Sequence, residues 1–269
     1  MNTTASETLE TTPLRVERVR HAFAARHLQL QAREIVSPGF VRVTLAGPEL
    51  AGFASAGFDD HLKFILPQAG QQRPNLPIIQ DGRPMFEGER PVTRDYTPVR
   101  WDTARGDLVL EFALHNTGPA AEWAVNAPLG QWVGVAGPRG SLVVPKEFEW
   151  HWLLGDESAL PAIERRLAEL PATACATVRI RVVDARDQRP LSSAARLDLQ
   201  WVDSLTAAAE QLALPAGDGF IWAAGEHNDM AALRRIVLAK PGVDAKRMRI
   251  AAYWKRGEIA HHAELASTP

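Results

Sequence analysis

The sequence lacks several features that define common classes of protein. Cys175 is the single cysteine among 269 residues, which excludes an internal disulfide, a CxxC pair and a cysteine-ligated iron–sulfur cluster. No stretch approaches the ~20 consecutive apolar residues that a membrane-spanning helix requires. Residues 1–13 also lack the basic and then apolar pattern of a secretion signal. We therefore expect a cytoplasmic location and no membrane insertion.

A large excess of charge of either sign is missing as well. The formal net charge at pH 7 is -2, so the chain as a whole does not attract nucleic acid or acidic lipid, and we expect no nucleic-acid partner. An anionic ligand would have to be held by a local group of basic side chains. With 46% hydrophobic and 23% charged residues, the composition is that of a globular protein with enough apolar residues for two domains.

The first half of the chain alternates apolar and polar residues as half-buried strands do. Turns rich in glycine and proline separate the runs, and the pattern is lost between residues 68 and 91, which predicts a long surface loop. The expected strands are at residues 28–36, 40–45, 61–66, 94–100, 107–115 and 131–136. They predict a six-stranded antiparallel β-barrel over residues 15–147, preceded by a disordered tail at residues 1–14.

From about residue 148 onward, strands alternate with helices. Expected strands lie at residues 150–155, 178–183, 199–202, 220–224 and 249–254, and expected helices at residues 159–170, 206–214 and 228–239. This repetition predicts a parallel sheet with right-handed crossovers, in which ligands lie beyond the carboxyl ends of the strands. Residues 148–269 thus form an α/β domain with a C-terminal helix, and the fold class is α+β with two domains.

The stretch Arg94-Asp95-Tyr96-Thr97 has the side chains of a ligand-binding wall. Alternate residues of a strand share a face, so Arg94 and Tyr96 are expected on one side and Thr97 on the other. A planar ring against Tyr96 and an anion at Arg94 would describe a flavin site. The alternative is a barrel strand with a core tyrosine and a solvated arginine.

A second candidate site follows the strand that ends near His115. In His115-Asn116-Thr117-Gly118-Pro119-Ala120, a Gly-Pro turn begins a short helix, and free amides at a helix N-terminus attract a diphosphate. The alternative is an ordinary turn before an amphipathic helix, with Trp123 in the core.

Two strand ends in the second half form the expected nicotinamide rim. One carries Asp156, Glu157, Ser158 and Ala159, and the other carries Gly225 and Glu226. The three-glycine dinucleotide fingerprint is absent. Asp156 or Ser158 can instead cap the following helix, and Glu226 can complement a helix dipole.

Three basic residues lie within or beside apolar strand ends, namely Lys63, Arg139 and Lys255. If they converge, they form a pocket for a bulky anion, and the alternative is a solvated surface position for each. The adjacent His261 and His262 would face different ways on a helix, so we regard them as surface residues and assign no metal ligand.

Taken in order, these motifs resemble the siderophore-interacting proteins, which are flavin-dependent ferric-siderophore reductases of the ferredoxin-reductase superfamily. The resemblance spans roughly residues 28–258 and is carried by Arg94–Arg100, Leu114–Ala124, Gly155–Ile163, Ala224–Glu226 and Tyr253–Gly257. Two departures are Asn116, where the family often has glycine, and Ala252, where its last motif usually begins with glycine.

The resemblance implies roles for the residues named above. FAD would lie on the barrel, its ring near Arg94, Asp95, Tyr96 and Thr97 and its diphosphate near His115, Asn116, Gly118, Pro119, Ala120 and Trp123. NADH or NADPH would bind the second domain, and Lys63, Arg139 and Lys255 would hold the ferric siderophore. The implied reaction passes electrons from NAD(P)H, or from ferredoxin, through FAD to Fe(III), which is then released as Fe(II).

Two alternative functions are compatible with the same fold. A general NAD(P)H:flavin or ferredoxin-type oxidoreductase would show no preference for iron chelates, and a non-catalytic siderophore-binding protein would carry no flavin. The nucleotide is also open, because Asp184 disfavours a 2′-phosphate while Arg186 and Arg189 favour one.

Overall fold

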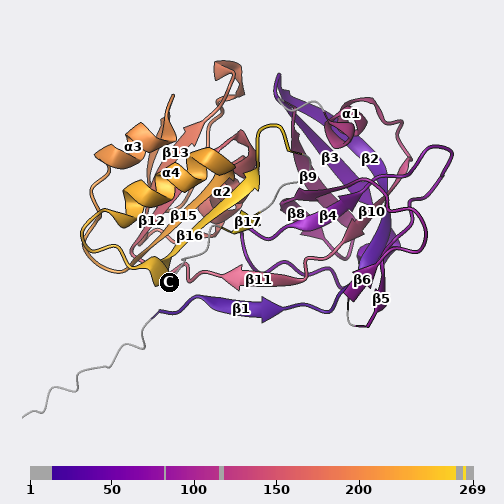
Figure 1. Cartoon of the computed structure of the whole chain (residues 1–269), viewed down its shortest axis with the longest axis horizontal. Helices are drawn as coiled ribbons and strands as arrows, with labels where there is room; N and C mark the ends of the chain where they lie inside the picture. Colours follow the sequence, from indigo (N-terminus) through magenta and orange to yellow (C-terminus); the bar gives the residue numbers. More distant parts are fainter. Residues whose placement is uncertain (1–13, 82, 115–117, 259–262, 265–269) are drawn as a thin grey trace, which may run out of the picture.

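The computed structural model describes residues 14–81, 83–114, 118–258 and 263–264. Within these residues, a mainly antiparallel half and an α/β half lie side by side (Figure 1). No helix in this part of the chain combines the length and the apolar character needed to cross a membrane.

The first half is built on a seven-stranded antiparallel sheet, one strand more than the six predicted. The strand order is β7-β4-β10-β2-β3-β9-β8. The bounds are β2 Ala25–Ser37, β3 Phe40–Ala46, β4 Leu62–Ile65, β7 Thr93–Tyr96, β8 Pro98–Asp102, β9 Asp107–Ala113 and β10 Trp132–Ala136. Alternate residues of these strands point inward, which buries a core that includes Leu28, Val43, Phe64, Leu110 and Phe112.

The extra strand arises because the predicted strand 94–100 divides at Thr97. Pro98 begins β8, and its missing amide cannot extend the ladder that β7 makes with β4. β7 and β8 therefore stand at opposite ends of the strand order while Thr97 alone separates them in sequence. The sheet must curl until its two edges approach each other, and Thr97 lies where they meet.

Two short pairs of strands add to the predicted elements. β1, Glu17–Arg20, pairs with β11, Gly140–Val143, and β1 is exposed throughout. β5, Ile78–Gln80, and β6, Arg83–Met85, form a hairpin inside the stretch predicted as a loop.

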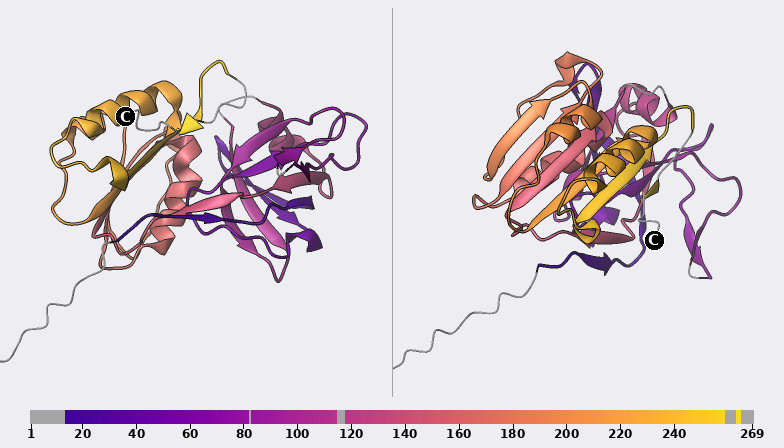
Figure 2. Two further views of the ribbon diagram at one scale, coloured as in Figure 1. Left: turned by 60° about the horizontal axis from the view of Figure 1, so that its bottom comes forward. Right: turned by 60° about the vertical axis from the view of Figure 1, so that its left-hand side comes forward.

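The second half is a six-stranded sheet, with five parallel strands and helices on both faces (Figure 1 and Figure 2). The strand order is β14-β13-β12-β15-β16-β17, with bounds β12 Trp150–Asp156, β13 Cys175–Arg181, β14 Arg196–Trp201, β15 Gly219–Glu226, β16 Met248–Trp254 and β17 Ala263–Glu264. Helix α2, Leu160–Glu169, packs on one face, and α3, Leu205–Gln211, and α4, His227–Leu238, pack on the other.

The chain reverses its direction across the sheet between β12 and β15. Such a switch point opens a crevice beyond the carboxyl ends of the strands, here at Asp156 and Glu226. Of the stretch in which we expect a C-terminal helix, Ala263–Glu264 are described, and they pair antiparallel with β16 as β17; residues 259–262 and 265–269 lie outside the described residues. His261 and His262 lie outside the described residues.

The two halves share a continuous apolar interface. Phe40 and Phe58 of the first half belong to the same buried cluster as Ile163 of α2 and Trp222 of β15. Arg189 bridges the halves, since it contacts Glu111 on β9 at 2.5 Å and Glu164 on α2 at 2.8 Å. These contacts hold the first half of the chain against α2 and β15 of the second half.

Candidate active site between the two halves

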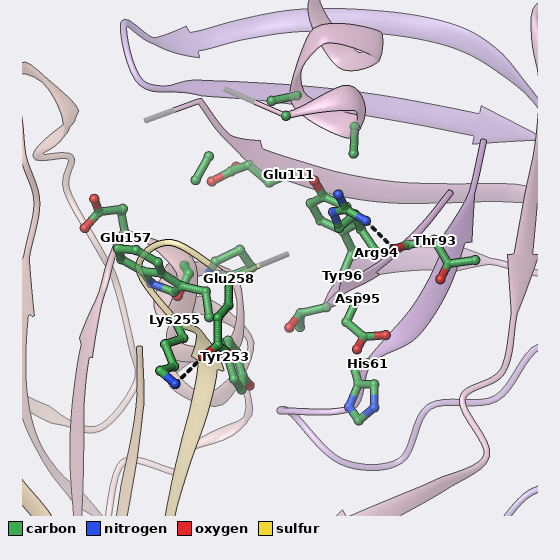
Figure 3. A pocket seen from close by; sticks show the side chains of 18 of the residues that line it. His61, Thr93, Arg94, Asp95, Tyr96, Glu111, Glu157, Tyr253, Lys255 and Glu258 are labelled. Carbon is green, nitrogen blue, oxygen red and sulfur yellow. Dashed lines mark hydrogen bonds and ion pairs between the residues drawn. The ribbon is translucent and has the colours of Figure 1, made fainter. Parts of the chain in front are cut away.

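A cleft of about 500 Å³ lies between the two halves. Figure 3 shows Arg94, Tyr96 and His61 on one side and Glu157 and Lys255 on the other. The first side comes from β4, β7 and the start of helix α1, Pro119–Asn126. The second comes from the turn after β12 and from the chain that follows β16.

Tyr96 forms an aromatic wall of the cleft. Its ring centroid lies 4.1 Å from that of Phe112 and 5.8 Å from that of Phe64, so core side chains hold the ring in place. Burial raises the pKa of Tyr96, which keeps the phenol neutral. The sequence offered a core tyrosine or a ligand wall as alternatives, and Tyr96 packs on the core and lines the cleft at once.

Arg94 and Thr97 line the same cleft as Tyr96. The Arg94 guanidinium donates a hydrogen bond to the carbonyl oxygen of Thr93 at 2.8 Å, which restrains this half-buried cation. The expectation that Thr97 faces away is wrong, because β7 ends at Tyr96 and strand alternation does not continue through the junction.

The first turn of α1 faces the cleft through Gly118, Ala120 and Ala121. Gly118 is the N-cap and offers no side-chain acceptor, and Pro119 follows at the first helical position. The amides of a first turn have no intrahelical acceptor, so those of Ala120 and Ala121 can meet a ligand. His115 and Asn116 lie outside the described residues.

Trp123 has a different position from the one predicted. It is buried, with its ring centroid 5.0 Å from that of Phe64, and it is not among the residues that line the cleft. Trp123 is therefore a core residue, as the alternative prediction has it. It anchors α1 on the barrel and thereby fixes the helix N-terminus at the cleft.

Asp156 organises the rim of the second half. Its buried carboxylate accepts hydrogen bonds from the Ser158 amide at 2.9 Å, the Ser158 hydroxyl at 2.5 Å, the Glu226 amide at 2.8 Å and the Trp254 indole at 2.9 Å. These donors come from three segments. The Asp156 carboxylate therefore binds donors of the protein itself, as predicted by the alternative in which it caps the following helix.

Gly225 and Glu226 also serve the rim. Gly225 has a φ of 156°, and a Cβ there would lie 2.6 Å from the Asp156 carboxylate oxygen. Glu226 caps α4 by accepting from the amides of Asn228 at 2.6 Å and Asp229 at 3.2 Å. Of the residues predicted at the nicotinamide rim, Glu157 and Ser158 line the cleft. Ala159 is fully buried and does not line it.

Glu157 is an acid in an unusual environment. Burial, followed by the neighbouring charge of Asp156, raises the pKa of Glu157 to about 7. A carboxyl group in this state exchanges a proton near neutral pH, so the charge of the cleft depends on pH in that range.

The structure brings together two of the three predicted basic residues. Lys63 and Lys255 line the cleft, but each is paired with a carboxylate. The Lys63 amine lies 2.7 Å from Asp95, and the Lys255 amine contacts Glu258. Arg139 is exposed beyond the end of β10 and is not among the cleft residues.

The charged residues after β13 do not form a free nucleotide-recognition group. Arg186 pairs with Asp184 at 2.5 Å, and Arg189 is held between Glu111 and Glu164. The choice between NADH and NADPH stays open.

Sequence reasoning missed several cleft residues, among them Phe40, His61, Glu111 and Pro161. Tyr253 stood in a quoted motif without a role; it lines the cleft, and burial raises its pKa. The position of Tyr253 near the end of a predicted strand of the parallel sheet could have marked it as a cleft residue. No local signal marked Glu111, because its partners are 69 and 78 residues away.

Models of two protein-family domains match consecutive parts of the chain. Residues 29–142 match the siderophore-interacting FAD-binding domain, and residues 148–257 match the siderophore-interacting protein domain. The NADPH-dependent ferric-chelate reductase of Escherichia coli is 38% identical over 91% of this chain and 99% of its own length. The chain belongs to the siderophore-interacting protein family.

Other relatives agree with this family. The ferric vibriobactin reductase ViuB of Vibrio cholerae is 31% identical over 89% of this chain and 93% of its own length. The crystal structure of a siderophore utilization protein from T. fusca has a TM-score of 0.82 and 33% identity, covering 91% of this chain and 98% of the other. More distant structures share the fold: the CS-b5R domains of human Ncb5or match with a TM-score of 0.64 and 15% identity, covering 87% of this chain and 70% of the other.

Proposed function

We propose that this protein is an FAD-dependent reductase that takes electrons from NAD(P)H and reduces the iron of ferric siderophores. Family membership and the ferric reductases among the relatives support this function. The observation that carries it is a single cleft that joins an aromatic and cationic wall on the barrel to the switch-point rim of a parallel sheet. A reductase that uses NAD(P)H would work in the cytoplasm.

The described residues fit FAD. Tyr96 offers an aromatic ring held in place by Phe64 and Phe112, Arg94 offers a restrained cation, and α1 offers a glycine-capped N-terminus whose first amides lack acceptors. In the proposed assignment, Arg94, Tyr96 and Thr97 hold the isoalloxazine, while Gly118, Pro119 and Ala120 hold the diphosphate. Bound FAD would accept an electron pair from a nicotinamide and deliver the electrons one at a time.

The nicotinamide would approach from the second half. Glu157 and Ser158 line that side, and Asp156 keeps both in place by holding the turn closed. Helix α2 begins immediately after this turn. We assign Glu157 and Ser158 as contacts of the nicotinamide, and Asp156, Gly225 and Glu226 as the residues that shape its seat.

The ferric siderophore would dock at the mouth of the cleft, with Lys63 and Lys255 as its cationic contacts and Arg139 as a peripheral one. Chelation by hard oxygen donors favours Fe(III), so the conversion to Fe(II) weakens the complex and frees the metal. No protein acid or base is required for this electron transfer. The protein's part is to bind and orient the three reactants and to exclude water from Tyr96 and its surroundings.

Steady-state kinetics test this function. The FAD-loaded protein should turn over a ferric siderophore with NADH or NADPH, and a ferrous-specific chromogenic chelator should register one Fe(II) for each electron delivered. Free FAD or FMN as the acceptor is the control. Faster turnover with free flavin than with any ferric chelate would show a general flavin reductase, and chelate binding without flavin would show a binding protein.

A further inference from the structure

Each lysine of the proposed siderophore site has its own carboxylate partner. Lys63 on β4 stands directly opposite Asp95 on β7 in the antiparallel register, and their charged atoms are 2.7 Å apart. Lys255 pairs with Glu258 three residues later, across a turn closed by the Glu258 amide and the Lys255 carbonyl at 3.0 Å. Figure 3 shows the second pair and places Asp95 across the cleft from it.

These carboxylates are part of a wider balance of charge. Four cationic residues line the cleft, Lys63, Arg94, Lys255 and Arg256, and so do four acidic residues, Asp95, Glu111, Glu157 and Glu258. Glu111 is already balanced by Arg42 and Arg189, which lie outside the lining. With Glu111 set aside and histidine counted as neutral, four cations and three acids leave the described lining a formal charge of about +1. A cleft adapted to a multiply charged anion would show a larger excess of cations.

We propose that Asp95 and Glu258 determine specificity: by compensating Lys63 and Lys255, they make the site prefer ferric siderophores of low net charge over triply charged triscatecholates. This inference rests on the proposed function. In a ferric trishydroxamate, three single negative charges balance Fe(III). In a triscatecholate, six negative charges leave an excess of three.

The exposure of the two pairs explains how they can discriminate. The side chains of Lys63 and Lys255 are 50% and 34% exposed, and those of Asp95 and Glu258 are 19% and 46% exposed. Ion pairs that water reaches are weak, because water competes for their charges. An arriving ligand can therefore displace the carboxylates locally, but Asp95 and Glu258 remain at the cleft. A trianion is repelled by them over several ångströms, whereas a neutral chelate is not.

The physical size of the effect follows from Coulomb's law. A trianion about 8 Å from one carboxylate, in water and at moderate salt, loses about threefold in affinity, and in dilute salt about tenfold. Removal of both carboxylate charges should thus strengthen binding of the trianion by about tenfold or more at low ionic strength. Binding of a neutral chelate should change by less than about twofold.

Binding is best measured apart from reduction. Gallium(III) forms the same chelates as Fe(III) but does not accept electrons under these conditions. The FAD-loaded wild type, Asp95→Asn, Glu258→Gln and the double variant are titrated with gallium complexes of two tripodal ligands that share one scaffold, one with three catechols and one with three hydroxamates. Quenching of protein fluorescence, at low and at moderate salt, gives the dissociation constants. Asp198→Asn, which alters an exposed carboxylate that pairs with the buried Arg179 outside the cleft, is the matched control.

The inference predicts that the wild type binds the trishydroxamate more tightly. The double variant should gain affinity for the triscatecholate alone, with a steeper salt dependence, and the control should match the wild type. An unchanged ratio of the two dissociation constants in the double variant would overturn the role of Asp95 and Glu258. A wild type that binds neither chelate would instead refute the proposed function, and the inference with it.

Discussion

Arg165 is a buried cation that joins the two halves beside the proposed flavin site. It extends from α2 and donates to the Ser55 hydroxyl at 3.0 Å, the Pro98 carbonyl at 3.2 Å and the Ser55 carbonyl at 3.4 Å. Its guanidinium also lies 4.9 Å from the centre of the Trp101 ring. Burial lowers the pKa of Arg165 below the ordinary arginine value, as expected for a desolvated cation.

We predict that Arg165→Met destabilises the protein by about 2–3 kcal/mol. Methionine keeps the volume but leaves the carbonyls of Ser55 and Pro98 without this donor, which costs ~1 kcal/mol or more for each, and the contact with Trp101 adds ~1 kcal/mol. Relief from burying the arginine charge offsets part of this loss. The melting temperature should fall by about 5–10 °C.

The assay is thermal unfolding with Arg105→Met as the control, because Arg105 is 78% exposed and pairs with Asp107 at 3.2 Å on the surface. The control should lie within about 0.5 kcal/mol of the wild type. Because Pro98 follows Thr97, Arg165→Met should also weaken FAD binding. Equal stability of the two variants would refute the argument that Arg165 holds the halves together.

Three further predictions concern the cleft itself. Tyr96→Ala should weaken FAD binding by about tenfold, because a stacked aromatic ring is worth ~1 kcal/mol or more. Tyr96→Phe keeps the ring and should bind FAD within about threefold of the wild type. A flavin fluorescence titration gives both dissociation constants, and equal losses of affinity in the two variants would show that the Tyr96 ring does not bind FAD. The folded-state pKa of Glu157 is about 7, above its usual value of 4.5. The contribution of this carboxyl to the free energy of unfolding is therefore complete below pH ~4.5, and it is lost as the pH rises through ~7 and the buried group ionises. Glu157→Gln should therefore gain up to about 3 kcal/mol relative to the wild type between pH 5 and pH 8, and a constant difference in melting temperature across that range would contradict the shift. Gly225→Ala should cost about 1–3 kcal/mol in urea unfolding and weaken nicotinamide binding, since the new methyl would meet Asp156; unchanged values of both would show that the rim can relax.

The sequence predicted those elements whose burial leaves a local pattern. β3 alternates clearly because one of its faces is buried. The parallel strands β12 and β15 are mostly apolar and are buried along their whole length, because both of their faces are covered. β1 is exposed along its whole length, and its pairing with β11 is set by residues more than a hundred positions away. No periodicity could have revealed it.

The division at Thr97 shows a second limit. The run from Arg94 to Arg100 reads as one strand, and the partners of its two parts, β4 and β9, decide where it breaks. The candidate residues at the rim had two local interpretations, and for Asp156 and Glu226 the geometry supports the helix-cap interpretation. The ion pairs of Lys63 and Arg189 depend on the register or on the packing of the two halves, which local spacing does not encode.

An anaerobic absorbance titration tests the central claim most directly, because it follows cofactor and metal in one cuvette. The FAD-loaded protein is first bleached with one equivalent of NADH or NADPH, and a ferric siderophore is then added in steps. We predict a flavin spectrum that disappears with the nucleotide and returns in full after about two equivalents of Fe(III), the ratio that a two-electron donor and a one-electron acceptor require. A protein that takes up no FAD, or a reduced flavin that persists when the siderophore is in excess, would contradict it.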